Sequence, residues 1–230
     1  SLGTQDQPVR QGRRSGFVAS VRMSTHPDAP RRLLERMVTF SDGVMAIAIT
    51  LLVLNLAVPV LTDGESLASG LADIRPQAFA WILSFAVIAL LWNFHHRALD
   101  RLWGADRLLV AINFTFLALI SMLPFTSDLF GQYTGDGLAT AIYAANIAML
   151  GLSLTAVQAV GDNRGFRRED APPLNLLAGI VPMSFFAISI PVAFVDPTVA
   201  QAIWALSAIA DPTERLLRRT VPGLTSGPLE

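Results

Sequence analysis

A few ionisable and hydroxylated side chains lie inside or beside long apolar runs of this sequence. Asp42 lies within the first run, six positions after Arg36, and the adjacent pair His95 and His96 ends the second. An ionisable group at membrane depth is costly to bury, so it usually has a partner and a task. We interpret Arg36, Ser41, Asp42 and the two histidines as a polar network at one side of a membrane. The alternative is that these groups only satisfy one another at the interface.

These residues do not form a recognisable catalytic or metal centre. His95 and His96 are adjacent, so they cannot share one helical face, and the His-Glu-x-x-His spacing of metalloproteases is absent. Ser41, close to a helix start, is more simply a capping or packing hydroxyl than a nucleophile. The chain has no cysteine, which excludes thiolate chemistry. We therefore expect no enzyme activity, no catalytic residue, no metal site and no cofactor.

The composition indicates an integral membrane protein. Of the 230 residues, 52% are hydrophobic and only 15% are charged, whereas a soluble domain has about 25% charged residues. The mean hydropathy is +0.49. The net charge of −1 gives no electrostatic reason to expect a nucleic-acid partner. The expected environment is therefore a lipid bilayer.

Six apolar segments are candidate membrane-spanning helices. A helix needs about 20 apolar residues to cross a bilayer, and five segments reach that length: 37–60, 76–96, 107–125, 137–160 and 174–195. A sixth, 197–211, is short, and we expect Pro212 to end it. This pattern predicts an all-α transmembrane domain over 35–211, between a mobile tail at 1–34 and a C-terminal tail at 212–230.

The arginines predict how these segments are oriented. All but one of the 17 basic residues fall in the two tails and in the second-to-third and fourth-to-fifth loops. Basic residues near membrane spans favour the cytoplasmic side. If all these arginine-rich segments lie on one side of the membrane, both tails are on that side and the number of spans is even. This favours six spans over five. We therefore predict a multi-pass protein of the cell membrane with both termini and both tails in the cytoplasm.

The first span has two different faces. At about 100° per residue, Ile47, Leu51 and Leu54 lie on one stripe, beside an edge of small residues that includes Gly43 and Thr50. Small residues let two helices approach closely, so this helix is suited to packing against copies of itself. Ordinary packing within a bundle is the alternative.

Three segments carry a resemblance to a known family. They are Arg36-x-x-x-Phe40-Ser41-Asp42 with its aliphatic continuation, Leu91-Trp92-Asn93-Phe94-His95-His96-Arg97, and the stretch from Asn113 to Ser127. Together they resemble the signature of the transmembrane protein 175 (TMEM175) family, potassium channels of bacteria, archaea and lysosomes. The resemblance covers roughly residues 36–130.

The resemblance implies a homotetrameric, potassium-permeable leak channel whose first helix lines the pore. The constriction positions fall on Ile47, Leu51 and Leu54, and Thr50 matches a threonine implicated in potassium preference. Potassium is then the permeant ion, and the partners are further copies of the chain and the lipid bilayer. The positions that match the family motifs form one structural network, namely Arg36, Phe40, Ser41, Asp42, Trp92, His95, His96 and Asn113.

Other transport functions stay open at this point. The Thr-Val-Gly-Tyr-Gly filter of other potassium channels is absent, so a pore here must select without stacked carbonyls. A proton-conducting channel and an ion-coupled secondary transporter are the alternatives. Pro182 and Pro191 could break a helix as transporters require, but the sequence has no internal repeat. A non-conducting scaffold is a further possibility.

Overall fold

The structure, a computed structural model, describes residues 28–172 and 176–204, and the side chains of 176–182 are outside the description. Its elements are α1 (Ala29–Leu51), the 3₁₀ turn η1 (Leu52–Asn55), α2 (Leu67–Asp73), α3 (Arg75–Asp100), α4 (Arg107–Gln132), α5 (Gly137–Asn163) and α6 (Leu176–Ala193). Residues 197–204 are also helical.

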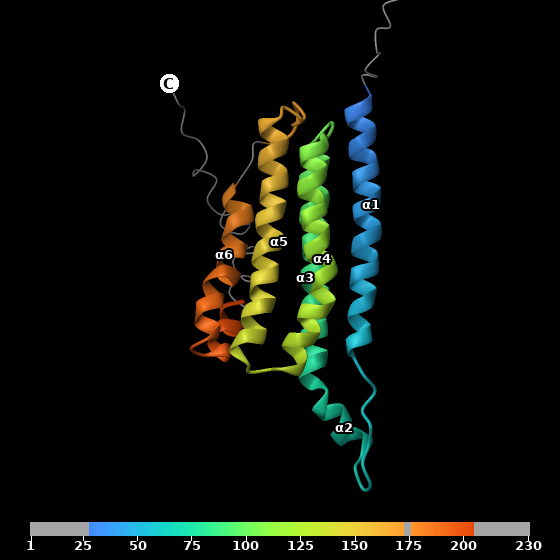
Figure 1. The fold of residues 1–230 in the computed structure, drawn as a ribbon, viewed down its shortest axis with the longest axis vertical. Coiled ribbons are helices and arrows are strands. Elements are labelled where there is room, and N and C mark those ends of the chain that lie inside the picture. The colour runs from blue at the N-terminus through green and yellow to red at the C-terminus, as the bar shows by residue number, and fades with distance from the viewer. Residues whose placement is uncertain (1–27, 173–175, 205–230) are drawn as a thin grey trace, which may run out of the picture.

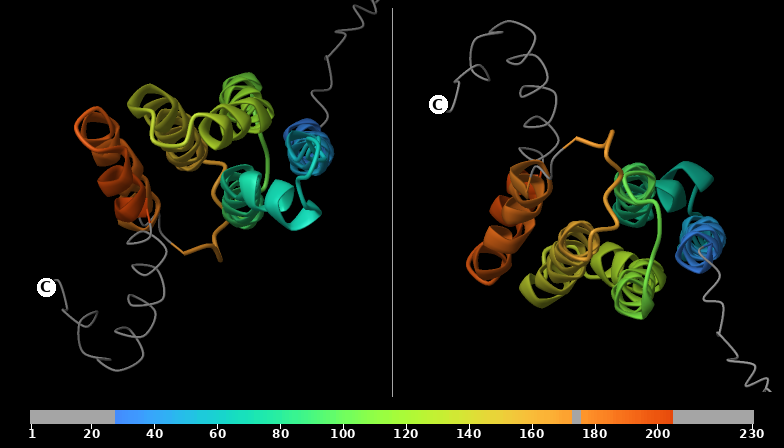
Figure 2. Two further views of the ribbon diagram at one scale, coloured as in Figure 1. Left: turned by 90° about the horizontal axis from the view of Figure 1, so that it is seen from below. Right: turned by 90° about the horizontal axis from the view of Figure 1, so that it is seen from above.

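The long helices lie side by side, with α1 at one edge and α6 at the other (Figure 1). Seen end-on, α1 packs beside α3 and α4, and α5 lies between α4 and α6 (Figure 2). The short α2 projects beyond one end of the bundle. One side of α1 is therefore left uncovered by the other described helices.

Local sequence explains where the helices begin. Asp106 and Asp136 cap α4 and α5 by accepting hydrogen bonds of 2.9 Å from the backbone N–H of Leu109 and Ala139. Prolines occupy the first turns of α1 and α3, where a missing N–H costs nothing. Pro30 lies in that first turn, so α1 begins before residue 34, where the N-terminal tail was predicted to end.

The predicted end of the first span needs correction. The sequence predicts a span over 37–60, but the α-helix stops at Leu51, and residues 56–62 follow the 3₁₀ turn without helical structure. Pro59 disfavours helical geometry at the residue before it. In contrast, α4 continues through Pro124 to Gln132, beyond the predicted end at 125.

The first four predicted spans are confirmed as helices long and apolar enough to cross a membrane. The fifth is a helix as predicted, and among the described residues its apolar part is the shorter segment Met183–Ala193. The first residues of the predicted sixth span are helical over 197–204, whereas 205–211 and the C-terminal tail lie outside the described residues. The regular structure of the described residues is thus helical, with four helices able to cross a membrane, and six spans remain a prediction.

The core lies between α3, α4 and α5. Phe116 and Ile120 of α4 and Tyr143 of α5 are fully buried there. A polar seam crosses this core: the Ser84 hydroxyl donates to that of Ser127 at 2.8 Å and lies 2.9 Å from the Tyr143 hydroxyl. Buried hydroxyls that satisfy one another in this way hold helices in one register.

The loop before α2 is shaped by a local turn outside the membrane-spanning segments. Glu65 accepts hydrogen bonds from the backbone N–H and the hydroxyl of Thr62. These bonds stabilise the charged carboxylate and lower the pKa of Glu65. Gly64, at φ 84°, supplies the left-handed backbone that the turn requires.

Candidate pore-lining face and its supporting networks

The uncovered side of α1 carries the predicted stripe. The side chains of Ile47, Leu51 and Leu54 are 61%, 42% and 74% exposed, whereas Met45 and Leu52 on the opposite side are buried in the core. The helix thus divides into two faces as its periodicity predicts.

Small and hydroxylated residues lie along the same open face. Thr50 is exposed, and its hydroxyl donates a 2.8 Å hydrogen bond to the carbonyl of Ile47. That bond uses the only proton of the hydroxyl, so the lone pairs of its oxygen are left to accept. A Cβ added at Gly43 would meet no atom within 4 Å. Another helix could therefore approach this face closely.

A shallow hollow of about 440 Å³ lies on α1 before the apolar stripe, lined by Glu35, Arg36, Thr39 and Phe40. Arg36 is exposed, and none of the described residues forms a hydrogen bond or ion pair with it. The structure therefore does not join Arg36 to Asp42. Six positions along a helix turn the chain by about 600°, which places the two side chains on different faces.

Three of the predicted network residues form a buried hydrogen-bonded chain. The side-chain nitrogen Nδ2 of Asn113 donates to the Ser41 hydroxyl at 2.9 Å, and the side-chain oxygen Oδ1 of Asn113 lies 2.8 Å from Nε2 of His95. Ser41 in turn donates to the Met37 carbonyl at 2.8 Å. Since a carbonyl oxygen can only accept, Nε2 of His95 carries the proton. This buried hydrogen-bonded chain links α1, α3 and α4.

The burial of this chain is nearly complete. The exposed fractions of Ser41, His95 and Asn113 are 0%, 2% and 1%. The His95 ring also stacks on Phe116, with centroids 4.8 Å apart. Unpaired polar groups at such depth are costly, so each of the three side chains requires the others.

A second group of predicted residues forms a more exposed string beside this chain. The indole Nε1 of Trp92 donates to the Asp42 carboxylate at 2.9 Å, and the Trp92 ring stacks on the His96 ring. Nε2 of His96 in turn lies 3.3 Å from the Asp100 carboxylate. Phe40 packs separately against Phe114 with centroids 5.4 Å apart. Asp42 thus faces α3 rather than the stripe of Ile47 and Leu54.

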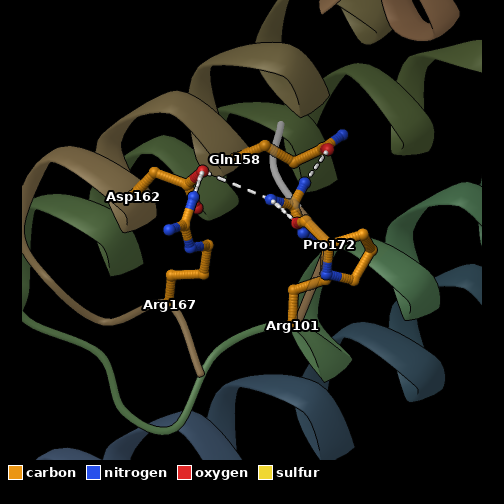
Figure 3. A network of polar contacts seen from close by, with 5 residues as sticks. All are labelled: Arg101, Gln158, Asp162, Arg167 and Pro172. Atoms are coloured by element: carbon orange, nitrogen blue, oxygen red, sulfur yellow. Dashed lines mark hydrogen bonds and ion pairs between the residues drawn. The ribbon is translucent and has the colours of Figure 1, made fainter. Parts of the chain in front are cut away.

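The sequence analysis missed a third network, at the arginine-rich end of the bundle (Figure 3). The Arg101 guanidinium donates to Gln158 at 3.1 Å, to Asp162 at 3.2 Å and to the Pro172 carbonyl at 3.0 Å. The Asp162 carboxylate also pairs with Arg167 at 3.7 Å. We call these five residues the arginine clamp. It fastens the loop after α3 to the end of α5 and to the loop that follows α5.

Backbone contacts extend the arginine clamp to the start of α1. Trp103 N–H donates to the Phe166 carbonyl at 2.9 Å, and Ala105 N–H donates to the Pro30 carbonyl at 3.0 Å. Gly104 permits the close approach, since a Cβ there would lie 2.8 Å from Cβ of Pro30. The two arginine-rich loops, after α3 and after α5, therefore lie together at the end of the bundle where α1 begins.

The segments that form most of these networks also match a known protein family. The profile of the family described as endosomal/lysosomal potassium channel TMEM175 matches residues 36–124. Residues 36–124 thus match the TMEM175 family. The match includes the α1 stripe, the buried chain of Ser41, His95 and Asn113, and the string that begins at Asp42. Of the arginine clamp, it includes only Arg101.

Bacterial and animal relatives carry different names. The chain is 33% identical over 121 residues to a potassium channel of Streptomyces collinus, and the alignment covers 52% of this chain and 59% of that protein. It is 28% identical over 179 residues to a potassium channel of a Chryseobacterium species, covering 76% and 90%. Human TMEM175, named an endosomal/lysosomal proton channel, is 31% identical over 140 residues, covering 54% and 28%. The chain thus spans less than two thirds of the Streptomyces relative.

The fold also matches a solved TMEM175 structure. The crystal structure of a lysosomal potassium-selective channel TMEM175 homolog from Chamaesiphon minutus superposes with a TM-score of 0.65 at 24% identity. The superposition covers 76% of this chain and 95% of that one. The arrangement of the helices is therefore that of the TMEM175 fold.

Proposed function

We propose that four copies of this chain form a potassium-permeable leak channel, with α1 of each copy lining the central pore. The observation that carries the proposal is the open face of α1, on which Ile47, Leu51 and Leu54 are exposed. One helix cannot enclose an aqueous path, so several copies must meet. The names of the bacterial relatives support potassium as the permeant ion, and the number four rests on the family resemblance.

The composition of this face supports helix contact over contact with lipid. The other long helices also expose large apolar side chains, such as Ile82 and Leu152, as lipid contact requires. On α1 the apolar stripe runs beside Gly43 and Thr50, which are both exposed. Small and hydroxylated residues are enriched where membrane helices pack together.

The proposed pore selects without a carbonyl filter. Ile47, Leu51 and Leu54 of the four copies would form successive apolar rings, and hydrophobic constrictions can gate a pore by expelling water. Stripping water from a cation is unfavourable unless other oxygens replace it. The Thr50 hydroxyls supply such oxygens, because each donates its proton to a carbonyl and directs its lone pairs elsewhere.

A planar bilayer recording tests the proposal. The purified full chain is reconstituted under a potassium gradient, and sodium then replaces potassium on one side. We expect small currents with a reversal potential near that of potassium. Flux that saturates with substrate and shows no single-channel steps would identify a secondary transporter, and the absence of both flux and current would identify a scaffold.

Proton conduction is the second candidate, because the animal relatives are named proton channels. The same bilayer under a pH gradient and symmetrical potassium tests it. A reversal potential that follows the proton gradient would replace potassium with protons as the principal permeant ion.

We also propose that the arginine-rich end of the bundle faces the cytoplasm, with both termini on that side. The loops that carry Arg101 and Arg167 meet at this end, and basic loops favour the cytoplasm. The chain contains no cysteine, so single cysteines can be labelled in cells. We expect an impermeant maleimide to label Ser69→Cys from outside and to leave Gly165→Cys unlabelled until the membrane is permeabilised. The reverse pattern would contradict the orientation.

A further inference from the structure

The geometry of α1 changes within the proposed constriction. The α-helix ends at Leu51, and Leu52–Asn55 form a 3₁₀ turn. In a 3₁₀ helix the side chains at positions i and i+3 eclipse, whereas in an α-helix they are offset by about 60°. The 3₁₀ turn therefore sets Leu54 in line with Leu51 along the helix. The direction of the Leu54 side chain depends on this short turn.

Two contacts hold the 3₁₀ turn against the rest of the chain. Leu52 is fully buried in the core. At the end of the turn, the side-chain nitrogen Nδ2 of Asn55 donates a 2.8 Å hydrogen bond to the backbone carbonyl oxygen of Pro124 in α4. A carbonyl oxygen has two lone pairs, so it can accept this side chain as well as a bond within its own helix.

The Asn55 bond matters because it ties the end of the turn to α4 by a side-chain hydrogen bond. A 3₁₀ helix has poorer hydrogen-bond geometry than an α-helix. After Asn55 the chain leaves helical structure, with Leu56 N–H donating back to the Val53 carbonyl at 3.0 Å. Val53 and Leu54 are both exposed, at 50% and 74%. Because successive residues of a 3₁₀ helix are about 120° apart, a rotation of the turn by about that angle would exchange one of these side chains for the other on the open face.

We propose that Asn55 is a positioning residue for Leu54, and that its bond to Pro124 sets which side chain forms the outermost ring of the constriction. The proposal rests on the proposed function, because it assumes that the open face of α1 lines the pore. Asn55 itself faces α4 and does not contact the permeant ion.

Cysteine cross-linking between copies tests the proposal. Leu54→Cys and Val53→Cys are made singly in the cysteine-free chain and again with Asn55→Leu, which has the same branching as asparagine and cannot donate. A bifunctional maleimide is applied to the assembled protein, and the cross-linked fraction is read from denaturing gels. In the parent we expect position 54 to cross-link faster than 53. A neutral hydrogen bond shifts an equilibrium by about two- to tenfold. We therefore expect Asn55→Leu to lower the ratio of cross-linking at position 54 to cross-linking at position 53 by that factor.

Further variants separate this role from folding alone. Asn55→Gln keeps an amide donor and should keep a ratio closer to that of the parent. Asn55→Asp has the size of asparagine but no donor when ionised, and it provides the second measurement if Asn55→Leu does not assemble. A purely structural role would lower the yield of assembled protein and leave the ratio in the assembled fraction unchanged.

Ile47→Cys distinguishes the two proposals. Ile47 lies before the 3₁₀ turn, so its cross-linking should be the same with and without Asn55→Leu. If Ile47→Cys cross-links and the ratio of positions 54 and 53 does not change, only the role of Asn55 is overturned. If Ile47→Cys does not cross-link in the parent, α1 does not line a shared axis, and both proposals fail.

Discussion

Ile47→Ala is expected to raise the current and to weaken discrimination between potassium and sodium. The side chain is 61% exposed on the open face of α1, so four copies would narrow the proposed pore at one level. Truncation to alanine widens that level and admits more water around the passing ion. A barrier lowered by about 1.4 kcal/mol raises a rate about tenfold, and we expect an effect of that order in bilayer recordings.

Met45→Ala is the matched control for this variant. Met45 is on the same helix, before the 3₁₀ turn, but is buried in the core, and such a truncation typically costs about 2–5 kcal/mol of stability. We expect it to lower the melting temperature and leave permeation through the assembled channels unchanged. Currents that are the same in Ile47→Ala and the parent would place the pore elsewhere.

Thr50→Val tests the source of selectivity in the same recordings. The substitution removes a hydroxyl at nearly constant volume, and the Thr50 side chain is exposed on the open face of α1 rather than buried within the chain. We expect a lower preference for potassium over sodium with little change in assembly. Retained preference would assign selectivity to pore diameter alone.

The sequence predicted the helices better than their ends. Long apolar runs and hydrophobic periodicity identified the first four spans and the two faces of α1, because burial in lipid or protein imposes these patterns directly. Helix ends depend on local backbone chemistry. The 3₁₀ turn after Leu51 and the passage of α4 through Pro124 leave no periodic signal, and the predicted boundaries at 60 and 125 therefore differ from the structure.

The networks show the same limit. Ser41, His95 and Asn113 could be assigned to one network from family motifs, but their pairing is a matter of three-dimensional packing. Arg101 and Asp162 are 61 positions apart, at the end of α3 and in the last turn of α5. No motif marks them, so the sequence analysis used such arginines only to orient the chain. Arg36 shows the reverse case, because proximity in sequence to Asp42 did not bring the two side chains together.

Asn113→Leu is expected to cause a large loss of stability. Asn113 bonds both Ser41 and His95, and all three side chains are buried. Leucine has the branched shape of asparagine, but it leaves the buried Nε2 of His95 without a partner and removes one of the two hydrogen bonds of Ser41, which keeps its bond to Met37. An unsatisfied buried group costs about 1–3 kcal/mol, a substantial part of the roughly 5–15 kcal/mol that stabilises a folded domain. The melting temperature in detergent and the tetramer fraction on size-exclusion chromatography should both fall. Asn93→Leu, an exposed asparagine of α3, is the matched control and should change neither.

A double substitution separates a structural role from contact with ions. If the cost of Asn113→Leu is the unpaired His95, then adding His95→Phe removes the stranded polar group, and the pair should be less destabilised than the sum of the two single variants. Replacing both partners by apolar groups of similar shape can be nearly neutral, and the Phe116 ring beside His95 offers an apolar neighbour. Channels that still assemble with Asn113→Leu should keep the potassium preference of the parent. An Asn113→Leu protein that is as stable as the parent but has lost that preference would instead place this buried chain in contact with the permeant ion.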